Sequence, residues 1–125
     1  MAERAYTITQ TNIYGIVLVE WAGLLNTDTG KPVKVPNFAD KTIQVSGTLG
    51  AGGSLSFQGS NDPADPPSNF GVLHRADAAL GDMVFTSAEG LEPSVALENP
   101  LWVRPIVTAG DGTTNLTCRM VGRNT

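Results

Sequence analysis

Two stretches of alternating apolar and polar residues, each interrupted by a glycine-containing link, most limit what this chain can fold into. In the first, apolar residues or glycine occupy every second position over 43–49, and the alternation resumes with Leu55 and Phe57 beyond the glycine-rich run 50–53. A period of two is typical of half-buried β-strands, and glycine accepts the positive φ angles that a chain reversal needs. We therefore predict a hairpin, which must recruit further strands because two strands alone are only marginally stable in water.

The second stretch lies near the C-terminus and predicts a partner for the first. Residues 101–108 and 113–121 have strand character, and the link between them, 109–112, contains Asp111-Gly112. An Asp-Gly pair between two apolar runs is a strong hairpin signal. We expect this second hairpin to pack beside the first.

The remaining segments predict shorter elements. Residues 6–11 alternate as a short strand or an extended arm would, and 13–21 is the most continuously apolar run, which favours a strand covered on both faces. The prolines within 31–36 limit that segment to an edge strand or a surface loop. Residues 83–86 again have strand character, and 75–80 have the composition of one helical turn.

These segments amount to about eight short antiparallel strands, the pattern of an all-β protein built as a β-sandwich or jelly roll. The chain has 125 residues, a length that fits one domain spanning 1–125. Within it, residues 1–12 form either an extended N-terminal arm or an edge strand.

The charge composition excludes some partners. The net charge is −4 and the eight basic residues are scattered, whereas nucleic-acid binding needs clustered Lys and Arg. No apolar run approaches the roughly 20 residues needed to span a bilayer, and the N-terminus lacks the pattern of a secretion signal. We expect no nucleic acid and no membrane as partner, and assembly in a cytoplasm. The low charged fraction of 16% suggests a surface partly covered by other subunits.

No group of residues has the pattern of an active site. His74 is the only histidine, and although Ser68 and Asp77 are near in sequence, no Gly-x-Ser-x-Gly turn is present. We therefore expect a solvated loop histidine. Cys118 is the only cysteine and lies in a strand-like run, where a buried and inert thiol is expected. The sequence predicts that the protein is not an enzyme and has no catalytic residue.

The acidic residues and the glycines do not indicate a cofactor either. The aspartates lack the spacing of a calcium loop, so we expect Asp62 and Asp111 to be turn formers. The glycines of 50–53 lack the Gly-Lys-Ser ending of a phosphate loop. We predict no metal site and no cofactor.

Trp102 and Arg104 are two residues apart, so both lie on one face of an extended strand. A tryptophan beside Leu101 and Val103 is typical of a core or a subunit interface, whereas an exposed ring would serve as a stacking platform for a sugar. A buried Arg104 needs a carboxylate or carbonyl partner, for example in an intersubunit salt bridge. The alternative is that Arg104 reaches solvent at the edge of the sheet.

The proline-rich segment 61–69 predicts a long exposed loop. Its prolines and small polar residues exclude regular structure, and long loops in compact domains tend to be functional. Asp62, Asp65 and Asn69 are therefore candidate contact residues.

Three pieces carry a resemblance to a known family: the turn 59–62, the segment 99–105 with the sequence Asn-Pro-Leu-Trp-Val-Arg-Pro, and the turn 110–114 before the last strand. Together they resemble small β-rich virion proteins of tailed bacteriophages, in particular capsid decoration (cement) proteins, over roughly residues 41–122. Related sequences often place a tryptophan shortly after the Ser-Asn-Asp turn, whereas prolines follow it here. The resemblance implies a jelly-roll-like fold and a dimer or trimer seated on the outer surface of a phage head.

The leading hypothesis is thus a structural virion protein that binds the major capsid protein and copies of itself. The candidate interface residues are Trp102, Arg104, Asp62, Asp65 and Asn69. The alternative is a carbohydrate- or receptor-binding β-sandwich module of a phage particle. That alternative predicts Trp102 or Tyr14 exposed in a groove, with Asn or Asp beside it.

Overall fold

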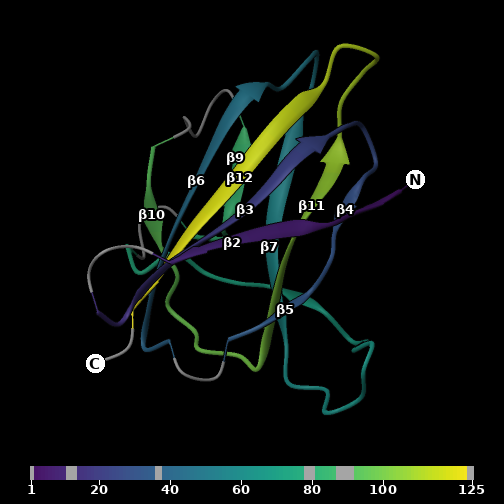
Figure 1. Cartoon of the computed structure of the whole chain (residues 1–125). Coiled ribbons are helices and arrows are strands. Elements are labelled where there is room, and N and C mark those ends of the chain that lie inside the picture. Colours follow the sequence, from purple (N-terminus) through teal and green to yellow (C-terminus); the bar gives the residue numbers. More distant parts are fainter. Residues whose placement is uncertain (1, 11–13, 36–37, 78–80, 87–91, 124–125) are drawn as a thin grey trace.

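The computed structural model describes residues 2–10, 14–35, 38–77, 81–86 and 92–123, which form two β-sheets (Figure 1). The seven-stranded sheet has the order β1 (Glu3–Arg4), β4 (Thr29–Gly30), β11 (Trp102–Ala109), β7 (Ser54–Ser60) and β8 (Gly71–Val72), with β5 (Val33–Lys34) also paired to β11 and β9 (Val84–Thr86) also paired to β7. The five-stranded sheet has the order β10 (Ser94–Val95), β6 (Asp40–Thr48), β12 (Asn115–Arg123), β3 (Ile16–Leu24) and β2 (Tyr6–Gln10). The all-β class predicted from the sequence is confirmed. The described residues form twelve strands in place of about eight, because five of these strands have only two residues.

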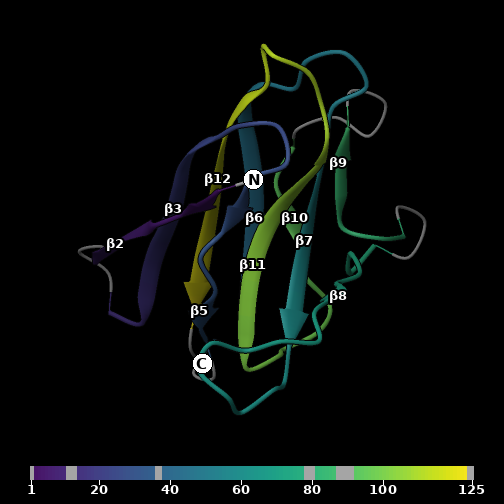
Figure 2. The ribbon, with the colours of Figure 1, turned by 90° about the vertical axis from the view of Figure 1, so that its right-hand side faces the viewer.

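Both predicted hairpins are wrong in their pairing. β6 and β7 belong to different sheets, and so do β11 and β12. Each glycine-containing link therefore carries the chain from one sheet across to the other, as Figure 2 shows with β3 and β12 on one side and β7 and β9 on the other. The predicted partnership of the two stretches is confirmed, because β6 pairs with β12 and β7 pairs with β11, both antiparallel.

The core lies between the two sheets, where the alternating apolar residues of both meet. The rings of Trp21 in β3 and Phe57 in β7 pack edge to face with centroids 6.0 Å apart, and the indole nitrogen of Trp21 donates to the Lys31 carbonyl at 2.9 Å. The buried cluster comprises Val19, Trp21, Leu24, Val33, Val35, Ile43, Val45, Leu55, Phe57, Leu73, Met83, Phe85, Ala96, Val103, Val107, Leu116, Cys118 and Met120. Cys118 is buried as expected, and burial raises the pKa of its thiol.

Four shorter predictions have mixed outcomes. β3 begins at Ile16 and its outer face is only half-buried, so the predicted cover on both faces is wrong; Ile13 lies outside the described residues. β5 confirms a short strand within 31–36, and β9 confirms the strand at 83–86. The helical turn over 75–80 is wrong for its described part, because Arg75 forms a β-bridge with Ala96.

The N-terminal segment contributes a strand to each sheet. β1 pairs in parallel with β4, and β2 pairs antiparallel with β3. The buried Asp28 holds this segment, since its carboxylate accepts from the Ala2 amide at 3.1 Å, the Arg4 Nε at 2.6 Å and the Leu25 amide at 2.9 Å. Residues 6–10 are therefore an edge strand, and no described part of 2–10 projects as an arm.

The two sheet-crossing links are held together by the side chains of Asp111 and Thr114. The Asp111 carboxylate accepts from the Ala51 amide at 3.0 Å and from the amide and hydroxyl of Thr113 at 2.8 and 2.6 Å. The Thr114 hydroxyl donates to the Leu49 carbonyl at 2.7 Å. We call these contacts the link clasp; both links lie at the top of Figure 1. The hydrogen bond from the Thr113 hydroxyl, followed by that from the Ala51 amide, lowers the pKa of Asp111 to about 2.

The clasp predicts an acid-dependent loss of stability. The pKa of Asp111 is about 2 in the folded protein, against an ordinary value of 3.8. The stabilisation that the Asp111 carboxylate gives to the folded protein is therefore fully present above the pKa of the unfolded state. It is lost as the pH falls through the pKa of the folded state. We expect Asp111→Ala to lower Tm at neutral pH by several degrees and to flatten the fall in Tm between these two pKa values. Thermal melts at stepped pH, with Asp65→Ala as control, check this; equal acid slopes for Asp111→Ala and wild type would contradict it.

Candidate functional site

The candidate site is the outer face of the seven-stranded sheet at the end of β7 and the start of β11, where the loop 61–70 covers the sheet. Trp102 and Arg104 lie on this outer face, because they alternate along β11 with the core residue Val103. The sequence placed both on one face, and the structure confirms it. The loop 61–70 follows β7 and lies at the bottom of Figure 1.

Trp102 is buried beneath the loop and not in the core between the sheets. Only 8% of the residue is exposed, and its indole nitrogen donates to the Asp62 carbonyl at 3.0 Å. The ammonium nitrogen of Lys34 lies 5.6 Å from the centroid of the ring, close enough for a cation–π contact. The ring is thus occupied by its own chain, which does not fit the exposed stacking platform of the carbohydrate alternative.

Asp62 gives the loop its shape. Its carboxylate accepts from the Ala64 amide at 3.0 Å and from the Ser68 amide and hydroxyl at 2.9 and 2.7 Å. Hydrogen bonding from the Ala64 amide first, and then from Ser68, lowers the pKa of Asp62. The expectation that Asp62 forms a turn is confirmed, and the exposed loop predicted at 61–69 is present without any strand. The loop is therefore ordered by internal hydrogen bonds.

Arg104 finds its partners within the chain. Its Nε donates to the Gln58 side-chain oxygen at 3.1 Å, and its guanidinium carbon lies 3.8 Å from the centroid of the Phe70 ring. Burial lowers the pKa of Arg104 despite the nearby charge of Glu3. The Gln58 oxygen is an amide carbonyl, so the carbonyl partner expected for a buried Arg104 is present within the chain, and the Phe70 ring adds a cation–π contact. Phe70 was not predicted as part of the site, because its sequence position gives no sign that it reaches β11.

The two remaining predicted residues point outward from the loop. Asp65 is exposed and lines a pocket beside Trp102, and Asn69 is exposed with a left-handed backbone, φ 58°. Asparagine tolerates this conformation better than most residues. The structure thus brings four of the five candidates to one surface, namely Trp102, Arg104, Asp62 and Asp65. The fifth candidate, Asn69, lies on the same loop as Asp62 and Asp65.

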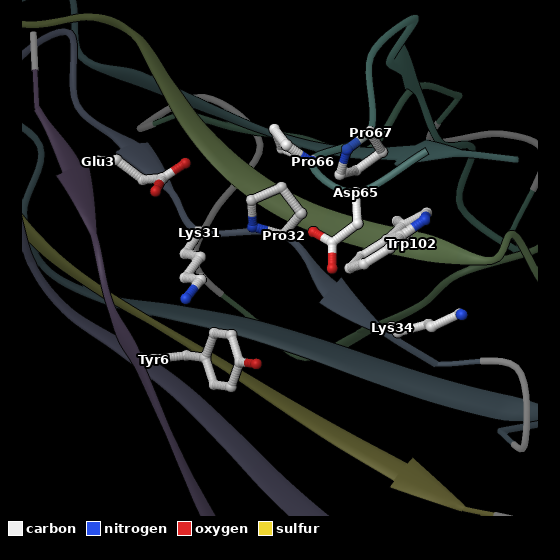
Figure 3. A pocket seen from close by; sticks show the side chains of 9 residues that line it. All are labelled: Glu3, Tyr6, Lys31, Pro32, Lys34, Asp65, Pro66, Pro67 and Trp102. Atoms are coloured by element: carbon white, nitrogen blue, oxygen red, sulfur yellow. The ribbon is translucent and has the colours of Figure 1, made fainter. Parts of the chain in front are cut away.

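The pocket beside Trp102 has a volume of about 320 Å³. In Figure 3, Asp65 and Trp102 lie together on one side, with Tyr6 and Lys31 on the other. Its lining residues are Glu3, Tyr6, Lys31, Pro32, Lys34, Asp65, Pro66, Pro67 and Trp102. They come from the N-terminal strands, the segment around β5, the loop and β11, so sequence reasoning missed most of them. Two lysines and two carboxylates give the pocket mixed charge.

The chemistry-bearing groups elsewhere have structural partners. His74 is exposed, as predicted for a loop histidine, but its Nδ1 contacts the Glu98 carboxylate and its Nε2 lies 3.4 Å from the Asp82 carboxylate. Glu98 raises the pKa of His74. Ser68 binds Asp62. Among the described residues, no group of three or more His, Cys, Asp or Glu is arranged to hold a metal ion, and no helix is long and apolar enough to cross a membrane.

One buried cation was not anticipated. Lys41 is fully buried in β6, and its ammonium nitrogen donates to the Asn99 side-chain oxygen at 2.5 Å and to the Phe38 carbonyl at 3.4 Å. Burial lowers the pKa of Lys41. Asn99 opens the Asn-Pro segment that carries part of the family resemblance, so its side chain here fastens the start of β11 to β6.

Comparisons with known proteins concern the fold. No protein-family model matches the chain, and no curated protein sequence matches it. The crystal structure of SPBc2 prophage-derived protein YomS matches with a TM-score of 0.62 at 12% identity, over 90% of this chain and 98% of that one. Protein NMB1881 from Neisseria meningitidis gives a TM-score of 0.43 at 13% identity, over 95% of this chain and 83% of that one. IMPa from Pseudomonas aeruginosa, in complex with an O-glycopeptide, gives 0.47 at 7% identity, over 93% of this chain and 13% of that one. The likeness to YomS supports the two-sheet fold. The two structures with TM-scores below 0.5 are too different to support a shared fold.

The burial of Trp102 under the loop predicts graded losses of stability. Trp102→Phe removes the indole donor and leaves the Asp62 carbonyl without it, which should cost about 1–2 kcal/mol. Trp102→Ala also empties the space under the loop and should cost about 3–5 kcal/mol. Denaturant unfolding measures both, with Leu97→Ala, at a residue 61% exposed, as control. A loss for Trp102→Ala no larger than the control would show that the ring does not support the loop.

Proposed function

We propose that this protein is a structural component of a phage particle, a decoration protein that binds the outside of the phage head through the surface formed by the loop 61–70 and β11. The observation that supports this most is the likeness in fold to a prophage-derived protein over nearly the whole of both chains. The family resemblance of the segments 59–62, 99–105 and 110–114 points the same way. In this proposal the two sheets have jelly-roll-like connectivity, and the major capsid protein and further copies of the chain are the partners.

The loop is suited to bind a large partner because it is already ordered. The Asp62 hydrogen bonds to Ala64 and Ser68 fix the backbone, and the bond from Trp102 ties the loop to the sheet. A surface that is fixed before binding loses less conformational entropy when the partner seats on it. Its exposed residues, including Asp65 and Asn69, can then contribute their contacts at little ordering cost.

The proposed mechanism is linkage. A ligand that binds only the assembled shell stabilises that shell in proportion to the logarithm of its concentration over Kd. No bond is made or broken, so the function needs no catalytic residue, metal or cofactor. In this proposal the protein is assembled in the host cytoplasm and stays in the virion.

Co-sedimentation tests the proposal directly. Purified protein is mixed with expanded, undecorated capsids of the phage that encodes the chain, and the pelleted fraction is measured over a concentration series. We expect saturable binding, weakened at least about tenfold by Asp65→Lys, since reversing a contact charge costs on the order of 1.4 kcal/mol or more. Asp40→Lys makes the same charge change on an exposed residue of β6 and should leave binding intact. Failure of the wild-type protein to pellet with the capsids would end this proposal.

A second candidate function rests on the pocket beside Trp102. Its volume of about 320 Å³ and its mixed aromatic and charged lining are in the range of small-ligand sites, which favours a carbohydrate- or receptor-binding module. Tyr14 is fully exposed, so no groove encloses it as that function predicted. Saturable glycan-array binding that is lost in Lys34→Ala and kept in Arg123→Ala, which removes an exposed cation at the end of β12, would favour this function. An array without signal would contradict it.

A further inference from the structure

β2 forms one edge of the five-stranded sheet. It pairs with β3 from Tyr6 opposite Trp21 to Gln10 opposite Val17, and no strand among the described residues pairs with its other side. The other strands at the sheet edges, β1, β8, β9 and β10, have two or three residues each, whereas β2 has five. Among these terminal strands, β2 therefore has the longest row of open backbone donors and acceptors; the stretch 44–48 of β6 that β10 leaves uncovered is interrupted by Gly47, with a φ of 110°.

The composition of β2 does not protect this edge. Soluble proteins usually shield a free edge with lysines, prolines, bulges or very short strands. The sequence of β2 is Tyr-Thr-Ile-Thr-Gln, without a charge or a proline, and the pairing with β3 is regular over all five residues. Tyrosine, threonine and isoleucine are also residues that favour strands. The edge is thus open to pairing with another strand.

Ile8 shows that the core is incomplete at this edge. It lies directly opposite Val19, a core residue only 1% exposed. Tyr6, two residues earlier on the same face, packs edge to face on Trp21 with centroids 6.2 Å apart. Ile8 itself is 49% exposed. A core-facing apolar side chain is half-exposed here because the sheet ends, and a further strand would cover it.

The sequence around Ile8 also matches a second copy of itself. Thr7-Ile8-Thr9 is the same in both directions, so antiparallel pairing centred on Ile8 places Ile8 beside Ile8 of the second copy and Thr7 opposite Thr9. Cross-strand pairs of β-branched residues and of two threonines are favourable. This pattern fits a two-fold contact, in which one patch meets its own copy.

We propose that two copies of this chain pair antiparallel along β2, centred on Ile8, and join their five-stranded sheets into one sheet of ten strands. The contact is isologous and closed, so it yields a dimer and does not propagate. This inference rests on the self-association included in the proposed function and names its surface. The dimer carries two copies of the loop 61–70, and two linked contacts on a shell bind more tightly than one.

A cysteine at the two-fold axis tests the geometry. In Ile8→Cys the two new thiols face each other across the pair, and the native Cys118 is buried and does not compete. We expect a disulfide-linked dimer on a non-reducing gel after mild oxidation, formed at least about tenfold faster than in Leu97→Cys, because pairing raises the effective concentration of the thiols. Leu97 is 61% exposed and follows β10, which lies at the opposite edge of the five-stranded sheet from β2. Equal and slow cross-linking of both variants would overturn the proposal.

Charge on the edge tests the same contact without changing the core. Thr7→Lys with Thr9→Lys sets lysines opposite lysines across the dimer, and both positions are exposed. We expect light scattering to give twice the chain mass for wild type and the monomer mass for this variant, with unchanged circular dichroism. The matched variant Gln44→Lys with Thr48→Lys, at exposed positions on β6, should remain a dimer.

Three results contradict β2 pairing: a wild-type monomer at every concentration, a wild-type trimer, and a dimer that the two lysines on β2 leave intact. The outcome of the capsid experiment does not depend on these three results. A cross-linked Ile8→Cys dimer that does not bind capsids would remove the proposed function and keep the pairing. Capsid binding by a protein that stays a monomer would remove the proposed pairing and keep the proposed function.

Discussion

The fold depends on the contact between the two links that cross from sheet to sheet. Asp111 and Thr114 bind the backbone of the neighbouring link at Ala51 and Leu49, so the two crossings lie side by side. With the two links held side by side, β6 pairs with β12 and β7 pairs with β11 over their whole lengths. The alternating apolar residues of all four strands then face one another across the core, and burying that surface supplies the main free energy of folding.

The surfaces proposed for function are placed by this arrangement. β11 is central in its sheet, so its inward residues complete the core while Trp102 and Arg104 support the loop 61–70 on the outside. At the other sheet, β2 ends the layer and leaves Ile8 half-exposed. The loop covers the first surface, which we propose as the contact with the shell. The second surface ends at β2, which we propose as the contact with a second copy of the chain.

The sequence predicted the strands better than their partners. Alternation located β6, β7, β11 and β12, because burial on one face imposes a period of two wherever the strand lies. A hairpin and a sheet-crossing link produce the same alternation, so the pattern alone could not separate them, and the Asp-Gly signal favoured the wrong choice. The shared face of Trp102 and Arg104 followed from spacing, whereas Phe70, Lys34 and the pocket depend on contacts between distant segments that no local pattern encodes.

Cross-strand nuclear Overhauser effects between backbone protons would show whether each glycine-containing link joins opposite sheets. We expect such contacts between Val45 and Cys118 and between Phe57 and Pro105, the paired positions of β6 with β12 and of β7 with β11, and none between the backbones of β6 and β7. A regular ladder of backbone contacts between β6 and β7 would contradict this expectation, because those strands would then form a hairpin within one sheet.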